Sequence, residues 1–167
     1  PYNFLSNYPL DMAAEEIEDR QAPFLEATHF YGDAFPWWWV NFGPGIMAGF
    51  LGAEVHSVSE PSETTWFTPR EVVPIEDLTL RYDPDNVWWQ RVQDVTRAIV
   101  ERWGDMIAVG HTDLGGNLDI LASFRETERL LFDLVDQPEE VDRLVDRITA
   151  LWLRYYDELD AITRPPC

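Results

Sequence analysis

The residues best suited to chemistry in this chain follow a short apolar run at positions 106–110. The next segment reads His111-Thr-Asp-Leu-Gly-Gly-Asn117, so a histidine and an aspartate stand two positions apart. Asp113 could orient His111 as a general base, or both side chains could bind a hard or borderline metal ion. A hydrogen-bonded structural pair in an ordinary strand-to-helix turn fits the same residues. The sequence therefore leaves a catalytic role for His111 and Asp113 open beside a structural one.

Two glycine-rich segments supply candidate substrate-binding residues. One ends a second apolar run, at positions 35–40, and reads Asn41-Phe-Gly-Pro-Gly45; the other is the segment after His111. Backbone amides in such segments can bind an anion or position a substrate, and a tight turn is the alternative. The candidate substrate-binding residues are Asn41, Gly43, Gly45, Gly115, Gly116, Asn117 and Asp119. Asp119 falls in the first turn of the next expected helix, where the helix dipole alone favours a carboxylate.

The two apolar runs are expected to be buried parallel strands joined by a long helix. The helix start Asp83-Pro-Asp-Asn86 is followed by apolar residues at helical spacing as far as Trp103. The run 35–40 would bury Trp37, Trp38 and Trp39 in the core, although one of them could line the pocket of a flat ligand. Ligand sites in α/β folds gather beyond the carboxyl ends of such strands. The pattern predicts a parallel βα architecture, either a barrel or an open doubly wound sheet.

Further helices are expected at both ends of the chain. Asp11 would cap a helix over residues 12–28. The longest helix would start at Asp136, with Glu139 completing a capping box. Residues 53–82 are interrupted by prolines, so we expect a loop there with one or two edge strands.

Composition narrows the class of protein. The 167 residues fit one domain, and the net charge of −19 would repel a phosphate backbone or an anionic membrane surface. The absence of lysine excludes Schiff-base and P-loop lysine chemistry within this chain, and the single cysteine, Cys167, excludes an intrachain disulfide. No apolar run reaches membrane-spanning length. We therefore expect a cytoplasmic protein that binds neither nucleic acid nor membranes.

Four segments follow one another in an order that is informative as a set. They are Asn41-Phe-Gly-Pro-Gly-Ile-Met-Ala-Gly-Phe-Leu-Gly-Ala-Glu54, Asp83-Pro-Asp-Asn-Val-Trp-Trp89, Thr112-Asp-Leu-Gly-Gly116 and Glu128-Arg-Leu-Leu-Phe-Asp-Leu-Val-Asp-Gln-Pro-Glu-Glu-Val141. This order resembles the uroporphyrinogen decarboxylase superfamily over roughly residues 34–162. The resemblance implies a (β/α)₈ TIM-type barrel of about twice this length. Residues 1–167 would then be a single domain, the N-terminal to central portion of that barrel, helix-rich and holding only its early strands.

The resemblance also implies which activities are to be expected. The arginine-rich loop of the family's decarboxylases has no counterpart here, their catalytic aspartate falls near Gly43, and their active-site tyrosine falls on Phe124. We therefore expect a divergent carboxy-lyase acting on a tetrapyrrole-like or other small substrate. The alternatives are a corrinoid-linked zinc methyltransferase and a non-catalytic barrel that binds a tetrapyrrole or a corrinoid. No cofactor is evident in these residues, and zinc ligands would lie beyond Cys167. The candidate partners are a small-molecule substrate, a corrinoid protein and a second copy in a homodimer.

Overall fold

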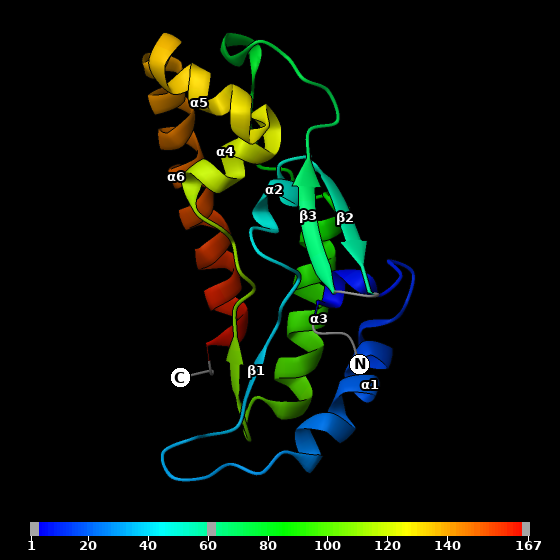
Figure 1. The fold of residues 1–167 in the computed structure, drawn as a ribbon. Helices are drawn as coiled ribbons and strands as arrows, with labels where there is room; N and C mark the ends of the chain where they lie inside the picture. The colour runs from blue at the N-terminus through cyan, green and yellow to red at the C-terminus, as the bar shows by residue number, and fades with distance from the viewer. Residues whose placement is uncertain (1–3, 60–62, 165–167) are drawn as a thin grey trace.

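The computed structural model describes residues 4–59 and 63–164 as a helix-rich α/β protein with two small sheets (Figure 1). Its elements are η1 (Leu5–Asn7), α1 (Ala14–Ala27), β1 (Trp37–Trp39), α2 (Met47–Phe50), β2 (Glu54–Val58), β3 (Thr64–Thr68), η2 (Ile75–Asp77), α3 (Val87–Trp103), β4 (Ala108–Gly110), α4 (Asn117–Arg125), α5 (Thr127–Asp136) and α6 (Pro138–Thr163). The long helices α3 and α6 run along the molecule, and α4 and α5 lie together at one end of it (Figure 1).

Strands β1 and β4 form a parallel pair, as the two apolar runs predict. The paired residues are Trp37 with Ala108, Trp38 with Val109 and Trp39 with Gly110. Backbone hydrogen bonds extend the pair at both ends, from the Ala108 amide to the Pro36 carbonyl (3.0 Å) and from the Val40 amide to the Gly110 carbonyl (3.2 Å). Helix α3 lies between the strands in the chain, so β1, α3 and β4 form the expected βα crossover.

The expected fold class is confirmed at its coarser level, as mixed α/β and helix-rich. Besides the parallel pair, strands β2 and β3 form an antiparallel hairpin with Glu54 opposite Thr68 and Val58 opposite Thr64. This hairpin accounts for the edge strands expected within residues 53–82. Within the described residues the strands form these two sheets of two strands and no closed barrel.

The expectation that both apolar runs are fully buried is wrong. Trp38 is buried, whereas Trp37 and Trp39 remain 51% and 42% exposed. Met106, at the start of the second run, is also exposed. Successive side chains of a strand point to opposite faces. Trp37 and Trp39 share one face of β1, and that face is less covered than the face that carries Trp38.

Helix α3 anchors the core through an aromatic cluster. It begins where the sequence predicts, because the side-chain oxygen of Asn86 accepts hydrogen bonds from the amides of Trp88 (3.0 Å) and Trp89 (3.1 Å). The fully buried Trp89 ring then meets Phe50 of α2 at 5.1 Å and Tyr155 of α6 at 4.8 Å between ring centroids. Tilted aromatic contacts of this kind add to the gain from burial. The cluster therefore fixes α2 and α6 against α3.

Two other helix starts differ from the prediction. Helix α1 is entered through Ala13 in an extended conformation, and Asp11 does not cap it. The expected capping box of Asp136 and Glu139 is also wrong, because α5 extends through Asp136. Helix α6 starts instead at Pro138, whose fixed φ suits the first helical position.

A buried ion pair joins α4 to α5. The Arg125 guanidinium donates from Nε to Asp133 Oδ2 (2.7 Å) and from Nη2 to Asp133 Oδ1 (3.0 Å), and both side chains are buried. Arg125 Nη1 also donates to the carbonyl of Val73. The pair therefore holds α4, which begins next to the candidate site residues, against both α5 and the segment before η2.

We predict that Arg125→Met lowers the free energy of unfolding by about 3 kcal/mol, because it leaves the Asp133 carboxylate buried without its partner. The double variant Arg125→Met/Asp133→Leu is expected to recover most of that loss, since it removes both charges together. Urea denaturation measures both values. A double variant less stable than the single one would contradict the prediction.

Candidate functional site

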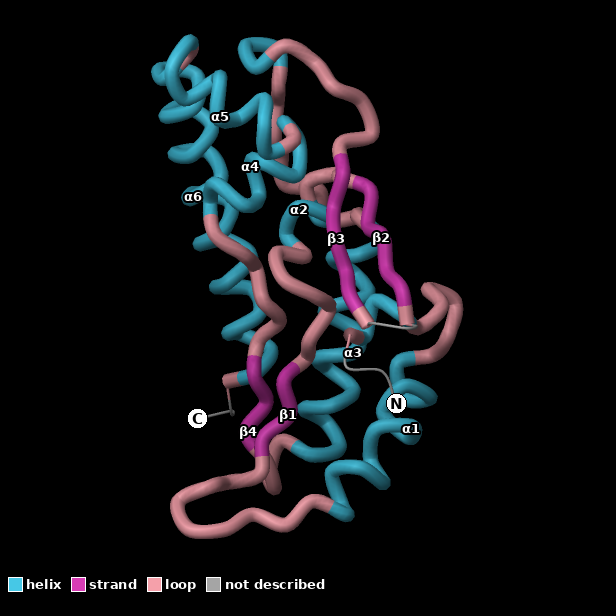
Figure 2. The backbone as a smooth tube through the Cα atoms, viewed as in Figure 1, coloured by secondary structure: helices cyan, strands magenta, loops and turns pink. Residues whose placement is uncertain are grey.

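Two loops leave the carboxyl ends of β1 and β4 and run side by side (Figure 2). We call them the strand-end loops, residues 41–46 and 111–116. The amides of Gly45 and Ile46 both donate to the carbonyl of Asp113 at 3.2 Å, which ties one loop to the other. The structure thus brings together the two groups of candidate residues that the sequence placed after separate strands.

In each strand-end loop, one side chain accepts a hydrogen bond from a backbone amide of the same loop. Asn41 Oδ1 accepts a hydrogen bond from the Gly43 amide at 3.0 Å, and Asp113 Oδ1 accepts one from the Gly115 amide at 2.8 Å. Both are short-range turns in which a side-chain oxygen binds the backbone two residues on. The amides of Gly43, Gly45 and Gly115, which were candidates for binding an anion, are therefore used inside the loops.

Glycine is required where the loops touch. Gly45 and Gly115 have φ values of +82° and +86°, a region that other residues rarely adopt. A Cβ atom added to Gly115 would lie 2.6 Å from the Cα atom of Gly45, inside any normal contact distance. The close approach of the two loops therefore depends on the absence of a side chain at Gly115.

His111 contacts α6 and not Asp113. Its Nε2 lies 2.8 Å from Thr163 Oγ1, and its ring meets the Tyr156 ring at 5.0 Å in an edge arrangement. Burial lowers the pKa of His111, while Asp160 opposes that shift. Across residues 4–59 and 63–164, no hydrogen bond joins His111 to Asp113. The two candidate catalytic side chains therefore share a loop but not a partner.

The remaining candidates lie at the start of α4. Gly116 occupies the N-cap position, and Asn117 Nδ2 donates to Thr149 Oγ1 of α6 at 2.6 Å. A Cβ atom at Gly116 would lie 2.8 Å from Asp119 Oδ2, so this carboxylate lies over the first turn of α4. The helix dipole favours a carboxylate there. In this structure Asn117 fastens α4 to α6.

The described part of the chain contains no group of three or more histidine, cysteine, aspartate or glutamate side chains placed to hold a metal ion. Cys167 lies outside that part, and zinc ligation by residues beyond it stays a prediction. None of the described helices is both long and apolar enough to cross a membrane.

The exposed face of the β1–β4 sheet carries two indoles that the sequence analysis placed in the core. The rings of Trp37 and Trp39 are 6.4 Å apart between centroids, and their planes differ by 11°. The residues opposite them on β4, Ala108 and Gly110, are small. A Cβ atom at Gly110 would lie only 2.9 Å from the Trp37 ring, so this ring extends across β4. Side-chain alternation along a strand was the signal that separates these two indoles from Trp38.

No protein-family model, no curated protein and no solved structure matches this chain. The candidate functional features of the described residues are the strand-end loops and the exposed indoles of Trp37 and Trp39, which we call the indole pair.

We predict that the pKa of His111 in the folded protein lies below its usual value of about 6.5. A histidine with a lowered pKa contributes stability at pH values above its unfolded-state pKa, and this contribution is lost as the pH falls. Relative to His111→Gln, the wild-type chain should therefore lose free energy of unfolding as the pH drops from 7 to 5. Urea denaturation at each pH and NMR titration of the imidazole measure the two effects. Parallel stability curves, or an imidazole pKa above 6.5, would show that the ring is not desolvated.

Proposed function

We propose that this chain is a divergent member of the uroporphyrinogen decarboxylase superfamily and forms an early part of a (β/α)₈ barrel. The parallel β1–β4 pair with its crossover helix α3 supports this proposal. So do the strand-end loops, which gather polar residues at the carboxyl ends of the strands, where barrel proteins place their sites.

The function that the geometry supports best is binding of a planar, tetrapyrrole-like molecule at the indole pair. The observation that carries this proposal is that Trp37 and Trp39 hold nearly parallel, half-exposed indoles opposite the small residues Ala108 and Gly110 of β4. Extended π faces favour flat conjugated ligands through stacking. On the barrel hypothesis this face points to the interior, beside the strand-end loops.

The net charge of the chain restricts how many carboxylates the ligand can carry. The chain carries a net charge of −19, so a macrocycle with many carboxylates would be repelled. Stacking on indoles requires no charge on the ligand. We therefore favour a corrinoid or a tetrapyrrole with few carboxylates over uroporphyrinogen itself.

We predict that hydroxocobalamin, or protoporphyrin IX with its two carboxylates, binds the wild-type chain saturably in a spectral titration. Trp37→Leu and Trp39→Leu should each weaken binding about fivefold, since each removes one stacking face. Trp66→Leu is the matched control, because Trp66 is similarly exposed but belongs to the β2–β3 hairpin. An absence of spectral change, or equal weakening by Trp66→Leu, would rule out the indole pair as the binding surface.

A carboxy-lyase or a corrinoid-linked methyltransferase is the second candidate. The observation that favours an enzyme is Asp113, a partly buried carboxylate at the carboxyl end of β4 within the strand-end loops. Such a group could act as a general acid or base or as a polar anchor, with His111 near it in the same loop. Methyl transfer would in addition need a corrinoid protein and zinc ligands from outside the described residues.

We predict that Asp113→Asn lowers turnover at least about 100-fold if Asp113 transfers a proton. Asparagine keeps the oxygen that accepts from the Gly115 amide, so thermal stability should stay within about 0.5 kcal/mol of the wild type. The assays are decarboxylation of a porphyrinogen and demethylation of methylcobalamin, with Asp142→Asn, an exposed carboxylate of α6, as the control. Full activity of Asp113→Asn would exclude this role.

A further inference from the structure

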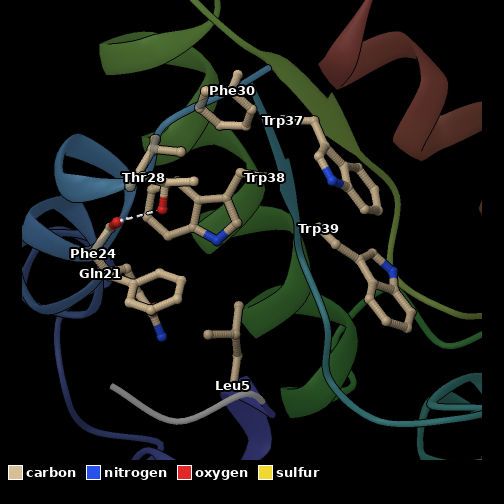
Figure 3. A pocket seen from close by; sticks show the side chains of 9 residues that line it. Leu5, Gln21, Phe24, Thr28, Phe30, Trp37, Trp38 and Trp39 are labelled. Carbon is tan, nitrogen blue, oxygen red and sulfur yellow. Dashed lines mark hydrogen bonds between the residues drawn. The ribbon is translucent and has the colours of Figure 1, made fainter. Parts of the chain in front are cut away.

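A second aromatic cavity lies on the other side of β1 from the indole pair. Figure 3 shows that Trp38 points towards α1, whereas Trp37 and Trp39 project from the opposite side of the strand. The cavity is bounded by η1, by α1 with the segment after it, and by β1; its lining residues include Leu5, Gln21, Phe24, Thr28, Phe30 and Trp38. Trp37 and Trp39 also contribute to the lining, so the cavity adjoins the surface proposed above to bind a macrocycle.

The size of this cavity restricts its occupant to a small ring system. Its volume is about 300 Å³, at the lower end of the range for small-molecule sites. An apolar protein cavity of about 150 Å³ holds a single benzene ring. The space therefore fits one or two fused rings and is too small for a tetrapyrrole.

The walls of the cavity indicate the chemistry of the occupant. Phe24, Phe30 and Trp38 offer aromatic surfaces, and no charged side chain lines the cavity within the described residues. Phe24 of α1 is 68% exposed, so its ring remains available for contact with a ligand. A neutral aromatic ring suits such walls, and an organic cation gains a further attraction to the ring faces. The charge of −19 on the chain disfavours an anion.

Thr28 is one of the polar residues that line the cavity, together with Gln21. The Thr28 hydroxyl donates its hydrogen to the Phe24 carbonyl at 2.8 Å. Its oxygen therefore has only acceptor capacity left, which suits an N–H group on the ligand.

We propose that the cavity between α1 and β1 binds a one- or two-ring aromatic amine or N–H heterocycle that carries no negative charge. This proposal does not depend on the barrel or on any catalytic role, and it shares Trp37 and Trp39 with the surface proposed for the macrocycle.

Three indole probes that differ in charge test the proposal by calorimetry and by NMR of the ¹⁵N-labelled chain. Tryptamine and indole should bind one to one with Kd on the order of 0.1 to 1 mM, and the indole N–H signal of Trp38 should shift. Indole-3-acetate should bind at least fivefold more weakly than tryptamine at low salt, and added salt should narrow that difference. Equal affinity for the anion, or no binding by any probe, would overturn the proposal.

Matched variants locate the binding. Phe24→Ala and Phe30→Ala should each weaken tryptamine binding about fivefold, since each removes one aromatic wall. Tyr31→Ala is the control, because Tyr31 is 81% exposed, lies next to Phe30 in the chain and does not line the cavity. Weakening by Tyr31→Ala to the same extent would refute the assignment.

Analytical ultracentrifugation of the same variants tests the alternative that a second copy of the chain occupies the cavity. A wild-type dimer that Phe24→Ala converts to a monomer, together with no probe binding, would show that the cavity is an interface and would refute the small-ligand proposal. A monomer that binds tryptamine supports it.

Discussion

The parallel pairing of β1 with β4 is the interaction on which the candidate sites depend. It places the two strand-end loops beside each other, and the bonds from the Gly45 and Ile46 amides to the Asp113 carbonyl continue the contact beyond the strands. A pair of such short strands is weak by itself. Its support comes from α3 and α6, which the buried rings of Trp89 and Tyr155 hold together.

The same pairing gives β1 two chemically different faces. Trp38 faces the helices and the cavity beside α1, whereas Trp37 and Trp39 lie on the uncovered face. Three consecutive tryptophans are thus divided between two surroundings, because a strand alternates its side chains. The proposed macrocycle surface and the proposed small-ring cavity therefore adjoin each other at β1, and Trp37 and Trp39 contribute to both.

Local signals in the sequence predicted much of this arrangement. The parallel strands and the start of α3 at Asn86 follow from apolar runs and cap chemistry. The hydrogen bonds between the two glycine-rich loops were not predicted. The burial of Trp37 and Trp39 was not predicted correctly, because it depends on which elements cover that face of the sheet, and no local pattern encodes this tertiary packing. The residues that contact His111 could not be predicted from the sequence either. Thr163 and Tyr156 stand on α6 about 50 residues away, and only tertiary packing brings them to the ring.

The glycine contact between the strand-end loops has a consequence for folding kinetics. The amide of Phe42 and the hydroxyl of Thr112, which also join these loops, are 70 residues apart in the chain. Contacts of such long range form after local helices have appeared, because loop closure must come first. Segments that close late and are held by few bonds also open most readily in the native state. Hydrogen exchange at the Gly45 and Ile46 amides would report that opening directly, and any ligand that bridges the two loops would slow it.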